Sequence, residues 1–321
     1  MAPHTYEPPV DALLRCGECQ GASVKDWPNY VQEFGLTADH VPALIQMAQD
    51  EQLWAFFEGD YDREGEFREA GITADEALWA PAHAWRSLGQ LQAAEAVAPL
   101  AEVLQERDFD WCWEEIPEVL GLIGEAAIAP LEELLSTQFN YNTKISLVGG
   151  FGKIAETFPD LRDRCVEVLT RLLSDYKHHH RSVNGALVTE LFKLKATDPD
   201  SVVAMEEAYK AKKVDEMFVG SWARVQVDLG LKQKSDFTPE ELAPHYTPQQ
   251  EQMMANIKAL TERLQRQQTL PPQNLPRHVG TKPPEFRDIA VQKGGKKLSD
   301  KSGFGAGSSS SKKGKKKKGK M

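Results

Sequence analysis

Two cysteines near the start of the chain have a spacing that suits metal or redox chemistry. Cys16 and Cys19 form a CxxC motif, and paired thiolates at this spacing bind zinc when two further ligands complete a tetrahedron. No second CxxC and no HxxxH lies nearby in the sequence. A redox site would need the motif between a strand and a helix, and that context is missing here. We therefore expect ordinary thiols near a helix end.

Three consecutive histidines, 178–180, are the other residues of metal-ligand type. Adjacent side chains on a loop point in different directions, so the run predicts a polar loop between two helices. The sequence contains no GxSxG, GxxxxGK[ST], GxGxxG or HExxH, the common signatures of nucleophile, phosphate and zinc chemistry. Acidic residues scattered over 102–133 are typical of a solvated helix face. We expect no catalytic residue, cofactor or metal.

Aromatic residues offer binding rather than catalysis. Trp85 lies on a helical apolar stripe, so we expect it in the core. Trp111 and Trp113, in the polar-flanked segment 108–115, are open to two interpretations, because burying two indoles requires a partner for each N–H group. They either pack in the core or face a groove, and tryptophan anchors many interfaces. We take Trp111, Trp113 and the neighbouring Glu114 as candidate partner-binding residues.

The C-terminal end of the chain is strongly basic. Residues 271–321 carry 14 Lys+Arg and 3 Asp+Glu, a net charge of +11, whereas residues 1–270 carry 24 and 45, a net charge of −21. With almost nothing apolar to bury, this tail is expected to be disordered. Its cationic patch consists of Lys312, Lys313, Lys315, Lys316, Lys317, Lys318 and Lys320. Such lysines attract phosphate backbones through counterion release, or they solubilise the chain or contact its acidic body.

The elements that position these residues are expected to be helices. Apolar residues recur at helical spacing, and alternating strand-like runs are nearly absent. Thr73–Glu76 and Thr238–Glu241 fit capping boxes, and Pro239 suits a first helical position. A last amphipathic helix is expected over 247–266, where it either covers the end of the helical array or binds a partner.

Composition narrows the setting of the protein. No stretch approaches the roughly 20 apolar residues that cross a bilayer, so we expect no membrane span. The N-terminus lacks the basic start and apolar run of a secretory signal. The 4 cysteines are too few for a disulfide framework in a chain of this length. These features predict a cytoplasmic protein.

An internal repeat determines the predicted architecture. Two copies stand out, LGQLQAAEAVAPLAEVL at 88–104 and LGLIGEAAIAPLEELL at 120–135, followed by a degenerate copy from 149 and a fainter one from 182. Gly89 and Gly121 are 32 residues apart, Pro99 and Pro130 are 31 apart, and Gly152 lies another 31 on. Each unit predicts a helical hairpin whose first helix closes near the glycine in a left-handed conformation. Because one hairpin cannot bury its apolar face alone, stacked hairpins predict an all-α solenoid.

These copies resemble HEAT-like repeats of the phycobilisome-lyase type, whose units read LG…A…A…PL…LL. The wider stretch 14–232, with WPNYVQEFGL, WAPAHAWRSLGQL and VDEMFVGSWARVQVDLGL, is similar to bacterial HEAT-repeat proteins of uncharacterised function. The resemblance implies an α-solenoid and, as one alternative, a chromophore lyase or lyase accessory subunit. Related proteins sometimes end in a Cys-rich zinc-binding tail; this tail has no cysteine, so no zinc site carries over.

Four regions are therefore expected: a helical N-terminal region with a half-repeat (1–78), the HEAT-like array (79–232), capping helices (233–268), and a disordered linker and tail (269–321). The leading hypothesis is a non-catalytic scaffold that holds a protein partner on its repeat surface. The alternatives are the chromophore lyase and an RNA- or ribosome-associated factor acting through the lysine-rich tail.

Overall fold

The computed structural model describes residues 6–21, 23–59, 64–69, 71–107 and 109–268, and within them every regular element is a helix. The all-α prediction is confirmed for these residues. The chain divides into two units, Met1–Ala259 and Leu260–Met321. The described helices belong to the first unit, except that the last helix continues into the second. Among the described residues, no helix is both long and apolar enough to span a bilayer.

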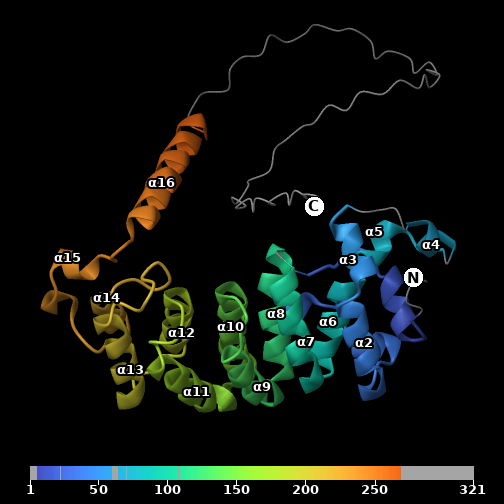
Figure 1. Ribbon diagram of the computed structural model, residues 1–321, viewed down its shortest axis with the longest axis horizontal. Coiled ribbons are helices and arrows are strands. Elements are labelled where there is room, and N and C mark those ends of the chain that lie inside the picture. The colour runs from blue at the N-terminus through green and yellow to red at the C-terminus, as the bar shows by residue number, and fades with distance from the viewer. Residues whose placement is uncertain (1–5, 22, 60–63, 70, 108, 269–321) are drawn as a thin grey trace, which may run out of the picture. The chain divides into compact units, whose positions relative to one another are not determined.

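Short helices make up the first part of the chain (Figure 1). They are the 3-10 helices η1 (Val10–Arg15), η2 (Val24–Asp26) and η3 (Ala38–His40), and the α-helices α1 (Tyr30–Phe34), α2 (Val41–Ala48), α3 (Glu51–Phe57), α4 (Glu64–Glu69) and α5 (Ala74–Ala77). The predicted half-repeat, 36–48, contains α2, which packs against the first long helix of the repeat region. The predicted capping box Thr73–Glu76 is present and opens α5.

Paired helices then form two rows (Figure 1). The first row contains α6 (Ala80–Gln90), α8 (Asp110–Ile123), α10 (Tyr141–Thr157) and α12 (Arg181–Lys193). The second row contains α7 (Val97–Glu106), α9 (Glu125–Leu135), α11 (Arg162–Ser174) and α13 (Pro199–Lys210), with the 3-10 turns η4 (Ala94–Ala96) and η5 (Pro159–Leu161) between the rows. Each helix contacts the next helix of its own row, and most also contact their hairpin partner.

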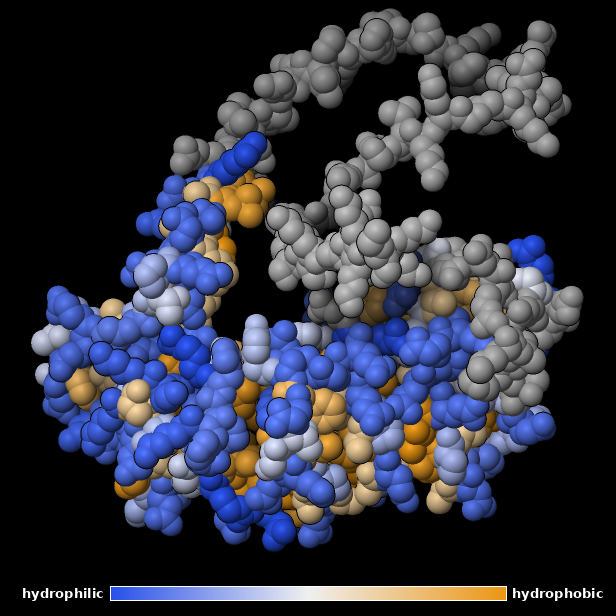
Figure 2. Space-filling view, in the orientation of Figure 1, coloured by the Kyte–Doolittle hydropathy of each residue, from blue (hydrophilic) through white to orange (hydrophobic). Residues whose placement is uncertain are grey.

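The core lies between the two rows. Every helix of the two rows contributes a large apolar side chain with at most 1% exposure: Leu88, Leu120, Phe151 and Leu187 from the first row, and Leu100, Leu131, Leu169 and Met205 from the second. Burying such a side chain stabilises the fold by about 1.5–3 kcal/mol. Figure 2 shows hydrophilic residues over most of the visible face, with hydrophobic ones between them along the stacked helices.

The repeat glycines have a different role from the predicted one. Gly89, Gly121 and Gly152 all lie inside helices, and none has a positive φ. The positive-φ residue that ends α8 is Gly124, with φ 74° and ψ −135°. The prediction of a left-handed closure at these glycines is therefore wrong. They instead allow neighbouring helices of the first row to approach closely. A Cβ on Gly89 would lie 3.1 Å from Leu122 Cδ1.

Gly121 shows this close approach most clearly. A Cβ at this position would lie 2.7 Å from the Cβ of Lys153 and 3.1 Å from its backbone carbonyl group. Helix α10 can therefore pack this closely against α8 only because residue 121 has no side chain. The 31–32-residue period of the sequence is thus the period of the contacts between helices in the first row.

A pair of glycine substitutions tests this role. We expect Gly121→Ala to lower the free energy of unfolding by about 1–3 kcal/mol because the backbone of α10 must shift. Gly149 of α10 has no atom closer than 3.9 Å to its virtual Cβ, so Gly149→Ala should instead stabilise the protein by about 0.5–1 kcal/mol through helix propensity. Urea unfolding followed by circular dichroism measures both. Equal effects of the two substitutions would contradict the packing role.

The last helices are α14 (Trp222–Asp228), α15 (Pro239–Leu242) and α16 (Pro248–Gln268), with η6 (Lys234–Asp236) before α15. The capping box Thr238–Glu241 opens α15, with Pro239 at its first position, as predicted. The apolar stripe predicted for α16 is 42–50% exposed and consists of Met253, Ile257, Leu260 and Leu264. That α16 caps the array stays a prediction.

Candidate partner-binding surface

A buried ion pair joins α6 to α8. Arg86 has no exposed surface, and Glu115 is 8% exposed. The Arg86 guanidinium donates to both carboxylate oxygens of Glu115, with Nε 2.9 Å from Oε2. The indole N–H of Trp85 donates to the same carboxylate at 2.9 Å, and Trp85 is 1% exposed, which confirms its predicted place in the core. This network fixes the position of the first turns of α8 relative to α6.

Arg86 belongs to a polar stripe that holds the N-terminal segment against α6. His83, Arg86 and Gln90 are spaced by three and four residues, so they share one helix face. Their side chains donate to three backbone carbonyls, at Gly17 (2.8 Å), Gln20 (2.7 Å) and Pro28 (2.7 Å). Residues 16–29 form little regular structure, so these carbonyls depend on side chains for hydrogen bonds.

The thiols of the CxxC motif are not activated for nucleophilic or redox chemistry. Cys19 Sγ lies 3.5 Å from Nδ1 of His83. Since Nε2 of His83 donates to Gly17, Nδ1 accepts the 2.8 Å hydrogen bond from the Tyr30 hydroxyl. Burial lowers the pKa of His83 to about 4 and raises the pKa of Cys19 to about 12. Near pH 7 the imidazole is neutral and the thiol is protonated, so the two do not form a thiolate–imidazolium pair.

The histidine run lies where the sequence predicted it, in the loop between α11 and α12. The imidazole of His180 caps α12 by accepting from the backbone N–H of Ser182, and its ring stacks on Tyr141 with centroids 4.4 Å apart. His179 contacts the carbonyl of Leu172 at 3.2 Å. Within the part of the chain that is described, no three His, Cys, Asp or Glu residues are grouped to hold a metal ion.

Trp111 opens onto a cavity of about 740 Å³, named here the Trp111 cavity. Its lining residues are Cys19, Gly21, Ser23, Trp27, Trp111, Glu114, Glu115 and Glu118. Trp111 is partly buried and packs edge-to-face on Trp79, with ring centroids 4.2 Å apart. The N-terminal segment and α8 thus form a cavity with indole and carboxylate walls.

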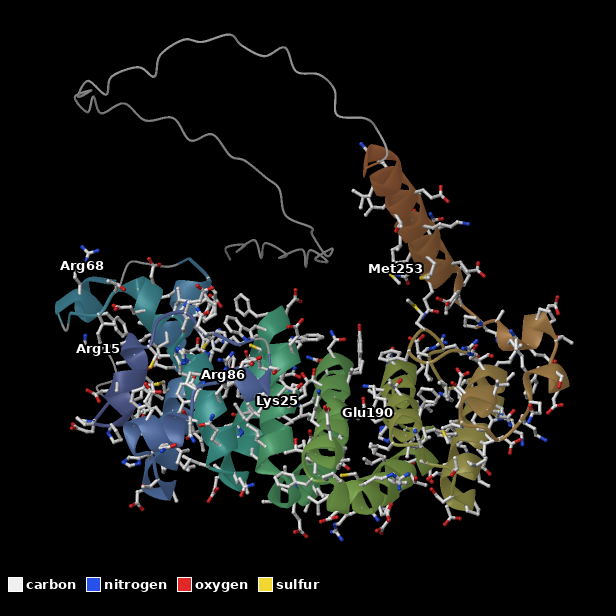
Figure 3. The ribbon with its side chains drawn as sticks, turned by 180° about the vertical axis from the view of Figure 1, so that it is seen from behind. Arg15, Lys25, Arg68, Arg86, Glu190 and Met253 are labelled. Carbon is white, nitrogen blue, oxygen red and sulfur yellow. The ribbon has the colours of Figure 1, made fainter. Side chains whose placement is uncertain are left out.

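Trp113 opens onto a second cavity of about 810 Å³, named here the Trp113 groove, along α8, α10 and α12. Among the described residues, the indole N–H of Trp113 has one long contact, 3.4 Å to the carbonyl oxygen of Arg107. Glu190 borders the groove among the first-row helices (Figure 3). Burial raises the pKa of Glu190, and a 2.8 Å salt bridge to Lys193 opposes that rise.

Glu114 lines both cavities. It is exposed, and its carboxylate has no ion-pair or hydrogen-bond partner among the described residues. Glu118, one turn further along α8, pairs with Lys153 at 2.6 Å. The structure therefore places all three predicted residues, Trp111, Trp113 and Glu114, on the walls of two cavities that share Glu114.

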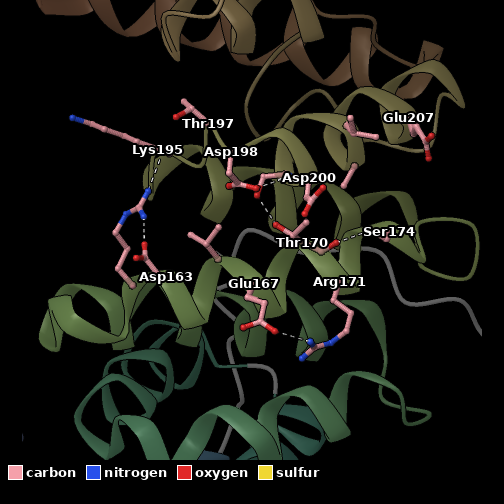
Figure 4. Close-up of a pocket in the computed structure, with 15 residues that line it drawn as sticks. Asp163, Glu167, Thr170, Arg171, Ser174, Lys195, Thr197, Asp198, Asp200 and Glu207 are labelled. Atoms are coloured by element: carbon pink, nitrogen blue, oxygen red, sulfur yellow. Dashed lines mark hydrogen bonds and ion pairs between the residues drawn. The ribbon is translucent and has the colours of Figure 1, made fainter.

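Two other cavities have a different character. One, of about 930 Å³, lies along α11 and α13 (Figure 4). Several of its polar groups contact one another, as in the 2.6 Å hydrogen bond between the hydroxyls of Thr170 and Ser201 and the ion pair of Arg171 with Glu167. A cavity of about 570 Å³ beside α14 is lined by Tyr209 and Trp222, whose rings stack with centroids 5.5 Å apart.

Charge is distributed unevenly along the chain. Residues 1–150 contain 7 Lys+Arg and 27 Asp+Glu, a net charge of −20, whereas residues 151–259 contain 15 and 17, a net charge of −2. The Trp111 cavity belongs entirely to the acidic half. A cleft walled by one sign of charge concentrates counterions of the opposite sign.

Sequence reasoning missed Trp27 and the Arg86–Glu115 pair. One signal was available for Arg86: His83, Arg86 and Gln90 form a polar stripe on a helix that also contains three alanines. The predicted polyanion-binding lysines, 312–320, lie outside the described residues. Comparison with family models, curated proteins and solved structures gave no match to this chain.

Proposed function

We propose that this protein is a non-catalytic scaffold, built as a HEAT-like α-solenoid, that binds a protein partner on the first turns of α8. The observation that carries the proposal is the placement of Trp111, Trp113 and Glu114 on the walls of two cavities that share Glu114. Tryptophans that are half-buried in a concave surface are frequent anchors of protein interfaces. The solenoid is supported by two rows of hairpins whose helices contact the next helix in the row.

The perturbed titratable groups favour a structural role over a catalytic one. His83 and Cys19 are held un-ionised near pH 7, and the imidazole is used to fix the N-terminal segment. The lyase activity implied by the repeat resemblance stays a prediction, and an absorbance change with a bilin and an acceptor subunit is its test. We also propose a cytoplasmic location, because all four cysteines are free thiols.

Site-specific photo-crosslinking tests the scaffold proposal. A photoreactive phenylalanine analogue is placed at Glu114 in one variant and at Glu133 of α9 in another. Both positions are exposed, but only Glu114 borders the cavities. We expect a discrete crosslinked partner from position 114 in the source cells and none from position 133. Equal crosslinking from both positions, or none from 114, contradicts the proposed surface.

The basic tail supports a second candidate function, contact with a nucleic acid or another polyanion. The argument rests on charge alone, since seven lysines fall within nine residues, 312–320. Replacing those seven lysines by glutamine in the full chain should leave thermal unfolding unchanged. It should weaken RNA binding at low salt by about 10-fold or more, because fewer counterions are released. Undiminished RNA binding would remove the tail from this role.

A further inference from the structure

We propose that the Trp111 cavity receives a lysine or arginine side chain from a basic segment of the partner protein. This inference rests on the proposed scaffold function and adds the chemistry of the bound segment. Four features of the cavity support it: the combination of indoles with carboxylates, a bound cation within the chain itself, an unpartnered indole N–H, and the surrounding charge.

The walls of the cavity combine the two groups that bind organic cations. Trp111 provides an aromatic surface beside Trp27, whose ring already carries Arg86, and a cation over an indole is attracted by the ring quadrupole. Glu114 provides a carboxylate without a partner among the described residues, and Glu118 has Lys153 as its partner. A cation that enters the cavity therefore meets both an aromatic surface and an unpaired negative charge.

The chain already binds one of its own cations with the same wall residues. The Arg86 guanidinium carbon lies 4.5 Å from the centroid of the Trp27 ring, and the same guanidinium donates to both oxygens of Glu115. Trp27 and Glu115 both line the cavity. Arg86 thus shows within this structure that these groups can hold a guanidinium, while Trp111 and Glu114 offer the same pair of groups to a ligand.

Trp27 adds an observation that is independent of the acidic residues. Its side chain lines the cavity and is 8% exposed, yet its Nε1–H is buried and has no hydrogen-bond acceptor among the described residues. A buried donor without a partner is costly. A backbone carbonyl of a seated peptide would supply an acceptor once the atoms that now cover Nε1 move aside, whereas a free metal cation has no acceptor to offer.

The surrounding charge favours a basic segment over an isolated basic residue. The half of the chain that contains the cavity carries a net charge of −20. A field of this sign accelerates the approach of a polycation and falls off with added salt. The cavity would then select one side chain of a segment that the field has already attracted.

Fluorescence anisotropy with the full-length protein tests the inference. The probes are labelled octapeptides of alternating lysine and glycine, of alternating arginine and glycine, and of alternating glutamate and glycine as the control. We expect the two basic probes to bind and the acidic probe not to bind. Trp111→Ala should weaken binding of the basic probes about 10-fold through loss of the cation–π contact, and Glu114→Gln about 3-fold through loss of one charge.

Matched variants separate the cavity from diffuse surface charge. Glu133→Gln removes the same charge from an exposed site on α9 and should change affinity by less than about 1.5-fold, as expected for a distant, screened charge. Trp111→Phe keeps an aromatic ring and should recover most of the affinity, provided circular dichroism shows native helix content. Equal effects of Glu114→Gln and Glu133→Gln overturn the inference.

Two further outcomes are decisive. If position 114 crosslinks a partner but the basic probes ignore Glu114→Gln, the scaffold stands and the cation site is wrong. If neither assay involves position 114, both proposals fail.

The chain's own lysines are a competing occupant, so the basic probes are also titrated against the variant with seven Lys→Gln changes at 312–320. Markedly tighter binding to that variant would assign the cavity to the tail and overturn its assignment to a partner.

Discussion

Replacing Glu115 by alanine should lower the free energy of unfolding by about 3–5 kcal/mol, because the substitution leaves a buried guanidinium without its counter-charge. Arg86 is fully buried and donates to both oxygens of Glu115. The indole N–H of Trp85 would lose its acceptor as well. Urea unfolding monitored by circular dichroism measures the loss, with Glu115→Gln as a milder variant if the alanine protein does not fold.

A double substitution provides the control. Removing both charges with Arg86→Met and Glu115→Leu should cost much less than the single change, since apolar pairs of similar volume replace buried ion pairs at little net cost. Some loss should remain, because Arg86 also holds the carbonyl of Gln20 at 2.7 Å. A single-variant loss below about 1 kcal/mol, the range of exposed pairs, would show that water reaches Glu115.

Acid should destabilise the protein through His83. Burial holds the pKa of this imidazole at about 4 in the folded state, whereas an unfolded histidine titrates near 6.5. Between these values the unfolded chain binds a proton that the folded chain does not. The contribution of His83 to the free energy of unfolding is therefore fully present above about pH 6.5. It is lost as the pH falls toward 4, by about 3 kcal/mol in total.

Comparison of variants isolates the histidine from the many carboxylates. Between pH 7 and pH 4.5, the unfolding free energy of the His83→Gln variant should fall by about 2 kcal/mol less than that of the parent protein. His178→Gln, which replaces an exposed imidazole in the α11–α12 loop, provides the control for loss of a histidine away from the core. Identical pH profiles for the parent and His83→Gln would mean that the imidazole titrates normally and is open to water.

The local features of the fold could be predicted from sequence because they depend on short spacings. The capping boxes at Thr73 and Thr238 follow from residues three positions apart, and Thr247 caps α16 by accepting from the N–H of Gln250. The hairpins of 88–104 and 120–135 follow from apolar periodicity. Pro99 lies in the first turn of α7 and Pro130 lies inside α9.

The features that sequence could not supply depend on contacts between distant residues. A glycine near the end of a helical pattern fits either a left-handed closure or a close helix approach, and only the neighbouring α10 shows which applies to Gly121. Arg86 looks like a surface residue until Glu115, Gln20 and Trp27 surround it. The Trp111 cavity needs the N-terminal segment, whose course is fixed by side chains of α6 rather than by its own periodicity.

The uneven charge makes the body of this protein an electric dipole. The rows of helices begin in a segment with a net charge of −20 and continue into one with a net charge of −2, so the negative pole lies at the α2–α8 end (Figure 1). Near a charged interface, a dipolar molecule takes a preferred orientation. A positively charged surface captures it with the tryptophan-bearing end foremost, and an anionic surface turns that end away.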